Sequence, residues 1–236
     1  MKEVDLTILM PCLNEVESLP YCIDKAKSFL ERNKHIKGEI LIADNGSTDG
    51  SIDIAKNNGA RVINVVEKGY GSALINGIKN AKGKYIIMGD SDDTYDFLNL
   101  EKFYNKLVEG YDLVMGNRFL GGIEKGAMPL MNKYIGNPFL SFLAKKMFPC
   151  GVNDFHCGLR GFNKENILKL NINSPGMEFA SEIVVLSYLN NYKITEIPTT
   201  LSVGKRTHKP HLRPFRDGLR HIKVLLKLKR KYKKEN

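Results

Sequence analysis

Acidic side chains follow a short apolar segment in the first half of the chain, in the order Asp90-Ser91-Asp92-Asp93. Two carboxylates two residues apart at a strand end can share a hard divalent cation. Mg²⁺ takes one or two carboxylates and fills its other positions with diphosphate oxygens and water, and it neutralises charge on a departing diphosphate. Asp is also a favoured turn residue, so Asp90 and Asp92 predict a metal site mainly through their position after a buried strand.

Two further polar motifs each follow an apolar segment, PCLNE at residues 11–15 and DNGSTDG at residues 44–50. Carboxylates at neighbouring strand ends can hydrogen-bond a base edge and a ribose, and we predict such contacts for Glu15 and Asp44. Turn formation is the better interpretation for Ser47 and Asp49. Asn14 is compatible with both a nucleotide contact and a turn.

A glycine-rich element, Lys68-Gly69-Tyr-Gly71, precedes a helical pattern. Glycine lets the backbone approach a ligand closely, and a helix N-terminus favours phosphate. We therefore predict that Lys68 and Gly69 contact the ligand. The element is neither a P-loop nor a dinucleotide-binding fingerprint, because the spacing of both motifs is absent.

The hydrophobic periodicity predicts the scaffold that brings these motifs together. Strand-like segments alternate with helix-like segments four times in the first 90 residues. That alternation predicts an α/β fold with a mostly parallel sheet and helices on both faces. Open sheets of this kind bind ligands beyond the carboxyl ends of their strands, where all the motifs lie. The strands are expected at 6–10, 39–43, 61–66 and 84–88, and the helices at 20–32, 51–58 and 69–81, with Ser18 as a cap.

The second half of the chain is less regular. Residues 132–148 form an apolar helical pattern with Pro138 inside it, so a kink or break is expected there. Pro198 interrupts a segment that we expect to be an edge strand. The remaining expected elements are helices at 98–108 and 178–189, strands at 112–115, 158–162 and 193–203, a glycine-rich loop at 116–128, and a basic helix at 216–234 with an apolar stripe of Leu219, Ile222, Leu225, Leu226 and Leu228.

Charge is distributed unevenly along the 236 residues. The net charge is +10, and residues 205–236 hold 13 of the 36 Lys and Arg but only two acids. A basic tail indicates an anionic partner, either nucleic acid or an anionic membrane surface. The four cysteines show no zinc-ligand spacing and suggest reduced thiols. We find no signal peptide and no segment with the roughly 18 apolar residues of a spanning helix.

The ordered set of motifs resembles glycosyltransferase family 2. P-x-x-N-E, D-x-G-S-T-D, K-G-x-G-x-A and D-x-D-D occur in the right order and spacing within residues 4–120. Three later motifs resemble the polyprenyl-phosphate glycosyltransferases, which include dolichyl-phosphate mannose or glucose synthases and their undecaprenyl counterparts. These motifs are GNRF at 116–119, DFHCGLR at 154–160 and GMEFASE at 176–182.

The resemblance implies a GT-A fold and a set of site residues. Residues 1–204 would form the catalytic domain, with a nucleotide-sugar half at 1–120 and an acceptor half at 121–204; residues 205–236 would form a basic loop and an amphipathic helix. Mg²⁺ or Mn²⁺ would bind Asp90 and Asp92. Catalytic roles would fall to Asp92, Asp154 and Arg118. The donor would contact Pro11, Asn14, Glu15, Asp44, Lys68, Gly69, Asp90 and Ser91, and the acceptor phosphate Arg118, Arg160 and Arg206.

The chemistry of a phosphate acceptor fits these residue types. Arg presents a planar fork that binds phosphate bidentately. A phosphate monoester has its second pKa near 6, so it is largely ionised at neutral pH and needs no strong general base. We therefore expect an inverting single displacement in which Asp154 orients a group. By resemblance, UDP-glucose is the first donor to consider and GDP-mannose the second, with a polyprenyl phosphate as acceptor.

Residues 216–234 can lie on an anionic bilayer as a basic amphipathic helix, although a solvated charged helix is the alternative. We expect a peripheral protein on the cytoplasmic face of a membrane, or one attached through a spanning segment outside this chain. A nucleic-acid-binding module is disfavoured, because acidic motifs repel phosphates without a metal and no binding motif is evident. A sugar nucleotidyltransferase would need a glycine-rich loop after the first strand. A glycosyltransferase with a non-lipid acceptor stays open.

Overall fold

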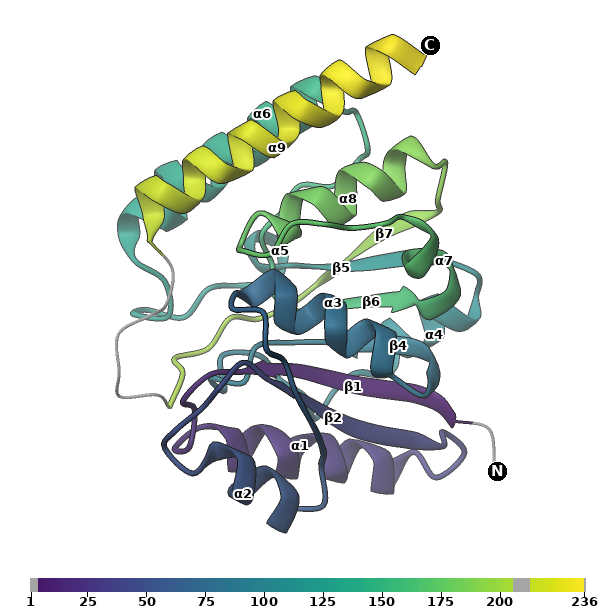
Figure 1. The fold of residues 1–236 in the computed structure, drawn as a ribbon, viewed down its shortest axis with the longest axis vertical. Helices are drawn as coiled ribbons and strands as arrows, with labels where there is room; N and C mark the ends of the chain where they lie inside the picture. Colours follow the sequence, from purple (N-terminus) through teal and green to yellow (C-terminus); the bar gives the residue numbers. More distant parts are fainter. Residues whose placement is uncertain (1–3, 206–212, 236) are drawn as a thin grey trace.

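The computed structural model describes residues 4–205 and 213–235. Seven strands form one sheet in the order β3-β2-β1-β4-β6-β5-β7 (Figure 1). Among these strands only β6 runs against its neighbours, which confirms the predicted mostly parallel sheet. The strands are β1 Val4–Cys12, β2 Gly38–Asp44, β3 Arg61–Asn64, β4 Gly83–Met88, β5 Leu113–Asn117, β6 Arg160–Asn163 and β7 Ile194–Pro198.

Helices cover both faces of the sheet and form two cores. Leu6, Ile8 and Met10 of β1 face one core, while Leu9 faces the other, because successive side chains of a strand point to opposite faces. This double burial explains the continuous apolar run of β1. The first core is covered by α1 (Leu19–Arg32), α2 (Ser51–Asn57) and α4 (Glu101–Val108), and the second by α3 (Tyr70–Asn80), α7 (Lys164–Lys169) and α8 (Phe179–Leu189).

The segment after β5 differs from expectation in two places. The predicted loop at 116–128 contains a short helix, α5 (Arg118–Gly121), capped by Asn117, whose side chain accepts a hydrogen bond from the Leu120 amide at 3.0 Å. Pro138 lies in the first turn of α6 (Asn137–Met147), where a missing amide proton is tolerated. The chain does not break there: the π-helical turn η1 (Asn132–Gly136) runs directly into α6, with helical backbone at Gly136 and Asn137.

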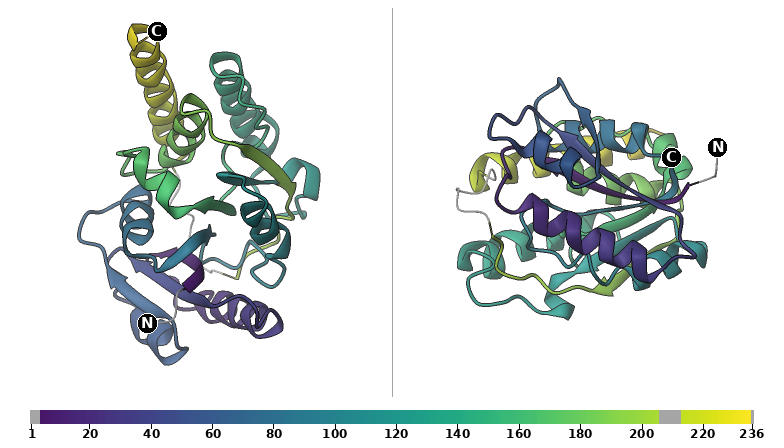
Figure 2. Two further views of the ribbon diagram at one scale, coloured as in Figure 1. Left: turned by 90° about the vertical axis from the view of Figure 1, so that its right-hand side faces the viewer. Right: turned by 90° about the horizontal axis from the view of Figure 1, so that it is seen from below.

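The basic C-terminal helix, α9 (Pro214–Glu235), contacts both α8 and α6. Figure 2 shows α6 and α9 projecting from the same end of the molecule. Leu225 and Leu228 are buried in the second core, whereas Leu219 and Leu226 are exposed. The predicted single apolar stripe is thus divided between the core and the surface. In 4–205 and 213–235, no helix combines the length and apolarity that crossing a bilayer requires.

Buried polar contacts dock α9 onto the domain. Nδ1 of His221 lies 2.8 Å from the Ser181 hydroxyl, which lies 3.4 Å from Nε2 of His156. The two imidazole rings meet edge to face at 4.7 Å, and Arg220 pairs with Glu178 at 2.9 Å. Burial, followed by nearby Arg160, lowers the pKa of His221 to about 4. Burial also lowers the pKa of His156 well below its ordinary value. Both rings are therefore neutral in the folded protein.

We expect the free energy of unfolding to fall as the pH is lowered from about 6.5 toward 4. In this window the unfolded state binds protons at His221 and His156 that the folded state excludes, so acid favours unfolding. His221 alone should contribute about 2 kcal/mol of this loss by pH 5. Urea unfolding at several pH values measures it. His221→Asn, which cannot titrate, should flatten the profile, whereas His35→Asn at an exposed position should not; equal profiles for all three proteins would contradict this account.

Candidate active site

The carboxyl ends of β1, β2 and β4 meet at one edge of the sheet. In the strand register Cys12 lies beside Asp44. The Ser91 hydroxyl donates to the Pro11 carbonyl at 2.7 Å, which ties the turn after β4 to the end of β1. The sheet thus brings together the polar motifs that follow its first, second and fourth strands.

Ser18 joins two of these motifs and does not cap α1 as predicted. Its hydroxyl lies 2.8 Å from the Ser91 carbonyl and 2.9 Å from Oε2 of Glu15, and its side chain makes no capping hydrogen bond to the helix. Glu15 and Ser91 are both buried. The predicted donor-binding residues Pro11, Glu15 and Ser91 therefore lie in one cluster.

The turn after β2 is held by its own side chains. Oδ2 of Asp44 accepts from the amides of Gly46 at 2.8 Å and Ser47 at 3.1 Å. Asp49 accepts from the Ser51 hydroxyl at 2.6 Å. The turn roles predicted for Ser47 and Asp49 are confirmed. The side chain of Asn14 also serves the turn, accepting from the Thr48 amide at 2.8 Å. The nucleoside contact of Asp44 stays a prediction for a carboxylate that is 1% exposed.

Lys68 and Gly69 pack against this turn through Asn45. The Lys68 ammonium donates to the Asn45 carbonyl and the Gly69 amide donates to its side chain, both at 2.7 Å. Gly46 has φ +97°, and a Cβ there would lie 2.0 Å from the Lys68 nitrogen, so only glycine allows the contact. The lysine charge is thereby placed beside the turn after β2.

Asp90 and Asp92 occupy one short turn after β4. Oδ1 of Asp90 accepts from the Tyr70 hydroxyl at 2.8 Å, and a Cβ at Gly158 would lie 2.3 Å from the other oxygen of Asp90. Asp92 accepts from the Thr94 amide at 3.1 Å. The neighbouring Asp93 is instead paired with Lys25 at 2.7 Å, which makes it a structural residue.

Two carboxylates in one turn fit a cation that takes its other ligands from a diphosphate and water. The described residues contain no group of three or more His, Cys, Asp or Glu side chains suited to a metal. Asp90 and Asp92 would supply two oxygen ligands of such a cation.

The chain after β7 returns to cover the Asp92 turn. The Lys205 amide donates to the Asp92 carbonyl at 3.1 Å, and the Ser202 amide to the Thr94 carbonyl at 3.0 Å. Gly204 is needed there because a Cβ would approach the Asp92 carbonyl to 2.6 Å. Arg206, predicted to bind the acceptor phosphate, lies outside the described residues.

Arg118 and Asp154 form a buried ion pair at the carboxyl end of β5. The guanidinium donates through Nε and Nη2 to the two carboxylate oxygens, each at 2.7 Å, and the Arg118 amide adds a third hydrogen bond at 3.0 Å. Burial opposes the charge, but Tyr95 and Asp154 outweigh it and raise the pKa of Arg118 well above its ordinary value. The pair places a fixed cation on the same edge of the sheet as Asp90, because β4 and β5 run in the same direction on either side of β6.

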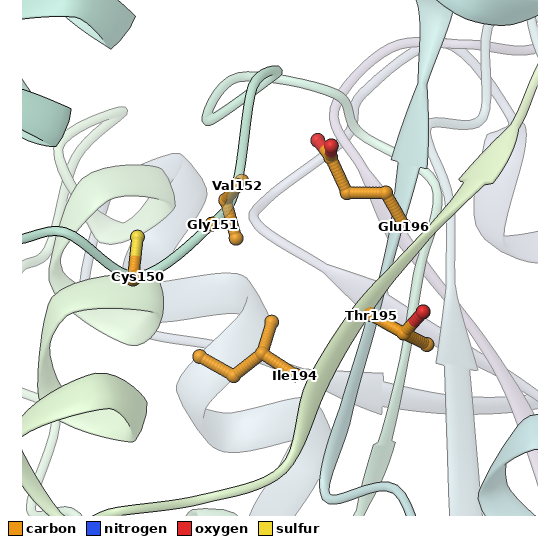
Figure 3. A pocket seen from close by; sticks show the side chains of 6 residues that line it. All are labelled: Cys150, Gly151, Val152, Ile194, Thr195 and Glu196. Atoms are coloured by element: carbon orange, nitrogen blue, oxygen red, sulfur yellow. The ribbon is translucent and has the colours of Figure 1, made fainter.

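Glu196 of β7 holds the backbone beside this ion pair. Its Oε1 accepts from the Asn153 amide at 2.8 Å and from the Asp154 amide at 2.9 Å. Figure 3 shows Glu196 beside a cavity of about 210 Å³ that Cys150, Gly151 and Val152 close from the opposite side. Among the described residues, no predicted site residue lines this cavity. Glu196, a side chain of strand β7, thus fixes the loop that carries Asp154. The sequence did not reveal this contact.

The structure does not support the predicted phosphate contact of Arg160. This side chain is 1% exposed, and its guanidinium donates to the carbonyls of Cys157, Ala180 and Phe155 at 2.7, 2.9 and 3.0 Å. Arg160 instead joins β6, the loop before it and α8, since buried donors must find acceptors.

The profile of the family described as Glycosyl transferase family 2 matches residues 7–170. The chain is 39% identical over 222 residues to the low-salt glycan biosynthesis hexosyltransferase Agl6 of Haloferax volcanii, covering 94% of this chain and 53% of that protein. It is 28% identical over 224 residues to a dolichyl-phosphate hexose transferase of the same organism, covering 95% and 93%. The chain thus spans about half the length of Agl6.

The fold also resembles that of a crystallised enzyme. Glucosyl-3-phosphoglycerate synthase from Mycobacterium tuberculosis, in complex with Mn²⁺, UDP and phosphoglyceric acid, superposes with a TM-score of 0.70 at 21% identity, covering 96% of this chain and 78% of that one. This likeness supports the GT-A-like α/β architecture. Since the family profile spans well over half of the chain, the chain belongs to glycosyl transferase family 2.

Proposed function

We propose that this protein transfers a hexose from a nucleotide-sugar to a polyprenyl phosphate with inversion of configuration. A phosphate oxygen of the acceptor attacks the anomeric carbon, the bond from that carbon to the donor diphosphate breaks, and a nucleoside diphosphate leaves. The family, and the similarity to the dolichyl-phosphate hexose transferase of Haloferax volcanii, support this reaction class.

The observation that favours a lipid acceptor is an exposed apolar face beside Arg118. Large apolar side chains gather on α5, on residues 130–142 and at the start of α9. Monomeric proteins rarely expose extended apolar patches unless these bind a partner or a membrane. A small soluble acceptor, such as the phosphoglyceric acid of the structural relative, would not require this face. Its members are Phe119, Leu120, Leu130, Met131, Tyr134, Ile135, Phe139, Phe142, Phe215 and Leu219.

Basic residues border this apolar face. Lys133, Lys145 and Lys146 belong to η1 and α6, and the exposed positions of α9 include Lys223 and Lys227. Apolar side chains flanked by Lys and Arg are typical of segments that lie in an anionic membrane interface. We therefore propose that this end of the molecule, including residues 216–234, lies on the membrane that contains the acceptor.

The two sides of the site would bind the two substrates. Pro11, Asn14, Glu15, Asp44, Lys68, Gly69 and Ser91 would surround the donor, and Asp90 and Asp92 would hold Mg²⁺ or Mn²⁺. When bound, the cation would neutralise the leaving diphosphate. Arg118 would bind the acceptor phosphate through its remaining N–H groups, and Asp154 would orient Arg118. UDP-glucose is the proposed donor and GDP-mannose the second candidate; the UDP of the structural relative favours the first.

Donor binding should stabilise the fold in a cation-dependent manner. At a donor concentration of about 100 Kd, linkage gives roughly 2.7 kcal/mol, visible as a rise in Tm with UDP-glucose and Mn²⁺. Asp92→Asn should remove the part of this rise in Tm that depends on Mn²⁺. Asp93→Asn is the matched control: it loses the pair with Lys25 but should keep the response to Mn²⁺. Equal responses of the two variants would contradict the assigned metal site.

Breaking the buried ion pair should reduce the reaction with the acceptor more than it reduces binding of the donor. Asp154→Asn leaves the Arg118 charge without its partner, at a cost of about 3–5 kcal/mol in unfolding free energy. We expect kcat/KM for a prenyl phosphate to fall by at least about 100-fold while the thermal shift with donor persists. Arg118→Lys, which keeps the charge but not the fork, should show the same pattern. A loss confined to donor binding would contradict the roles proposed for Arg118 and Asp154. Separately, a product that retains the anomeric configuration would exclude a single displacement.

Binding to anionic vesicles should depend on both the apolar face and α9. Deleting α9 would expose the core, because Leu225 and Leu228 are buried, so surface substitutions are the better test. Tyr134→Ser with Ile135→Ser, and separately Lys223→Glu with Lys227→Glu, should each weaken co-sedimentation with phosphatidylserine vesicles about tenfold or more, since each basic residue near the surface contributes about 1 kcal/mol. Leu168→Ser on α7 should have no effect. Undiminished binding of both double variants would refute this surface.

A further inference from the structure

A hollow of about 280 Å³ opens at the surface beside α5 and α6. Two half-exposed phenylalanines flank it, Phe119 at 41% and Phe142 at 65% exposure, and most of its surface is apolar. The hollow has about the volume of the smallest complete ligand sites, which span roughly 300–1,000 Å³, and this size suits one segment of a long ligand. Its lining residues are Phe119, Pro138, Ser141, Phe142, Lys145 and Asn153.

The hollow adjoins the Arg118–Asp154 ion pair at two points of the chain. Phe119 directly follows Arg118, and Asn153 directly precedes Asp154. These two segments are joined by the paired hydrogen bonds of 2.7 Å between the guanidinium and the carboxylate. One wall of the hollow is therefore formed by the direct chain neighbours of the two residues that we assign to the acceptor phosphate.

A second cation lies at the same rim. The Lys145 ammonium donates to the Asn153 side chain at 2.6 Å. An apolar hollow with Lys145 at its edge and Arg118 next to it is complementary to an amphiphile whose anionic head is attached directly to an apolar chain. The exposed aromatic rings of Phe119 and Phe142 would gain most from such a ligand, because burial of apolar surface is favourable.

From this juxtaposition we infer that the hollow binds the isoprenyl units nearest the phosphate of the acceptor. The inference rests on the proposed function and adds to it a specificity subsite. The enzyme would recognise the start of the lipid chain by direct contact. This recognition would act in addition to the binding of the enzyme to the membrane surface. It would therefore prefer a prenyl phosphate to a bare phosphate ester even in the absence of a bilayer.

Kinetics with water-soluble acceptors, in the absence of vesicles, tests this subsite. Farnesyl phosphate serves as acceptor, and methyl phosphate serves as a competitive inhibitor that reports on the phosphate site alone. Phe142→Ser should raise the KM for farnesyl phosphate about tenfold or more, as loss of a buried aromatic contact predicts, and leave the Ki of methyl phosphate unchanged. Phe142→Leu should restore most of the affinity. Val108→Ser, an exposed apolar position on α4, is the control and should resemble the parent.

The outcomes separate the subsite from the function on which it rests. An unchanged KM for farnesyl phosphate in Phe142→Ser, or a parallel rise in both KM and Ki, would overturn the subsite and leave the lipid acceptor standing. If the parent transfers sugar to 3-phosphoglycerate but not to farnesyl phosphate, the proposed function itself fails. The thermal shift with donor confirms that each variant is folded.

Discussion

The buried ion pair between Arg118 and Asp154 is the contact that holds a fixed cation at the carboxyl end of β5. A buried charge pair is costly unless its geometry is good and its remaining polar groups are satisfied. Here the carboxylate accepts three hydrogen bonds from Arg118, and Glu196 fixes the backbone that carries the carboxylate. A cation is therefore held rigidly at the end of β5, which is the condition for binding a phosphate without reorganisation.

The position of the polar motifs at one edge follows from sheet topology, and this part could be predicted. Alternating strands and helices require a parallel sheet, and a parallel sheet places the ends of its strands along one edge. Glu15, Asp44 and Asp90 follow the ends of three neighbouring strands and therefore lie along that edge. Turn residues such as Asp49 could be assigned because their hydrogen bonds are local.

Contacts between distant segments could not be predicted in the same way. Arg160 lies in a motif beside glycine, and nothing in its neighbours indicates that the Ala180 carbonyl, from another element, accepts one of its N–H groups. His156, Ser181 and His221 likewise meet only after α8 and α9 pack together. The periodicity of α9 predicted an amphipathic helix, but it could not show which leucines would face the domain, since that depends on the apolar surface that α8 and α6 present.

The apolar face and the ion pair suggest why the two substrates would approach from different sides. The motifs that follow β1, β2 and β4 are polar and suit a hydrated nucleotide, whereas Arg118 borders exposed aromatic side chains that suit a lipid. An ionised phosphate needs no general base, so Asp154 can remain engaged with Arg118 throughout a displacement. On the proposed function, catalysis would then depend on placing two anions in line and balancing their charge. A membrane-bound acceptor would favour this arrangement, because the interface restricts the orientation of its head group before it enters the site.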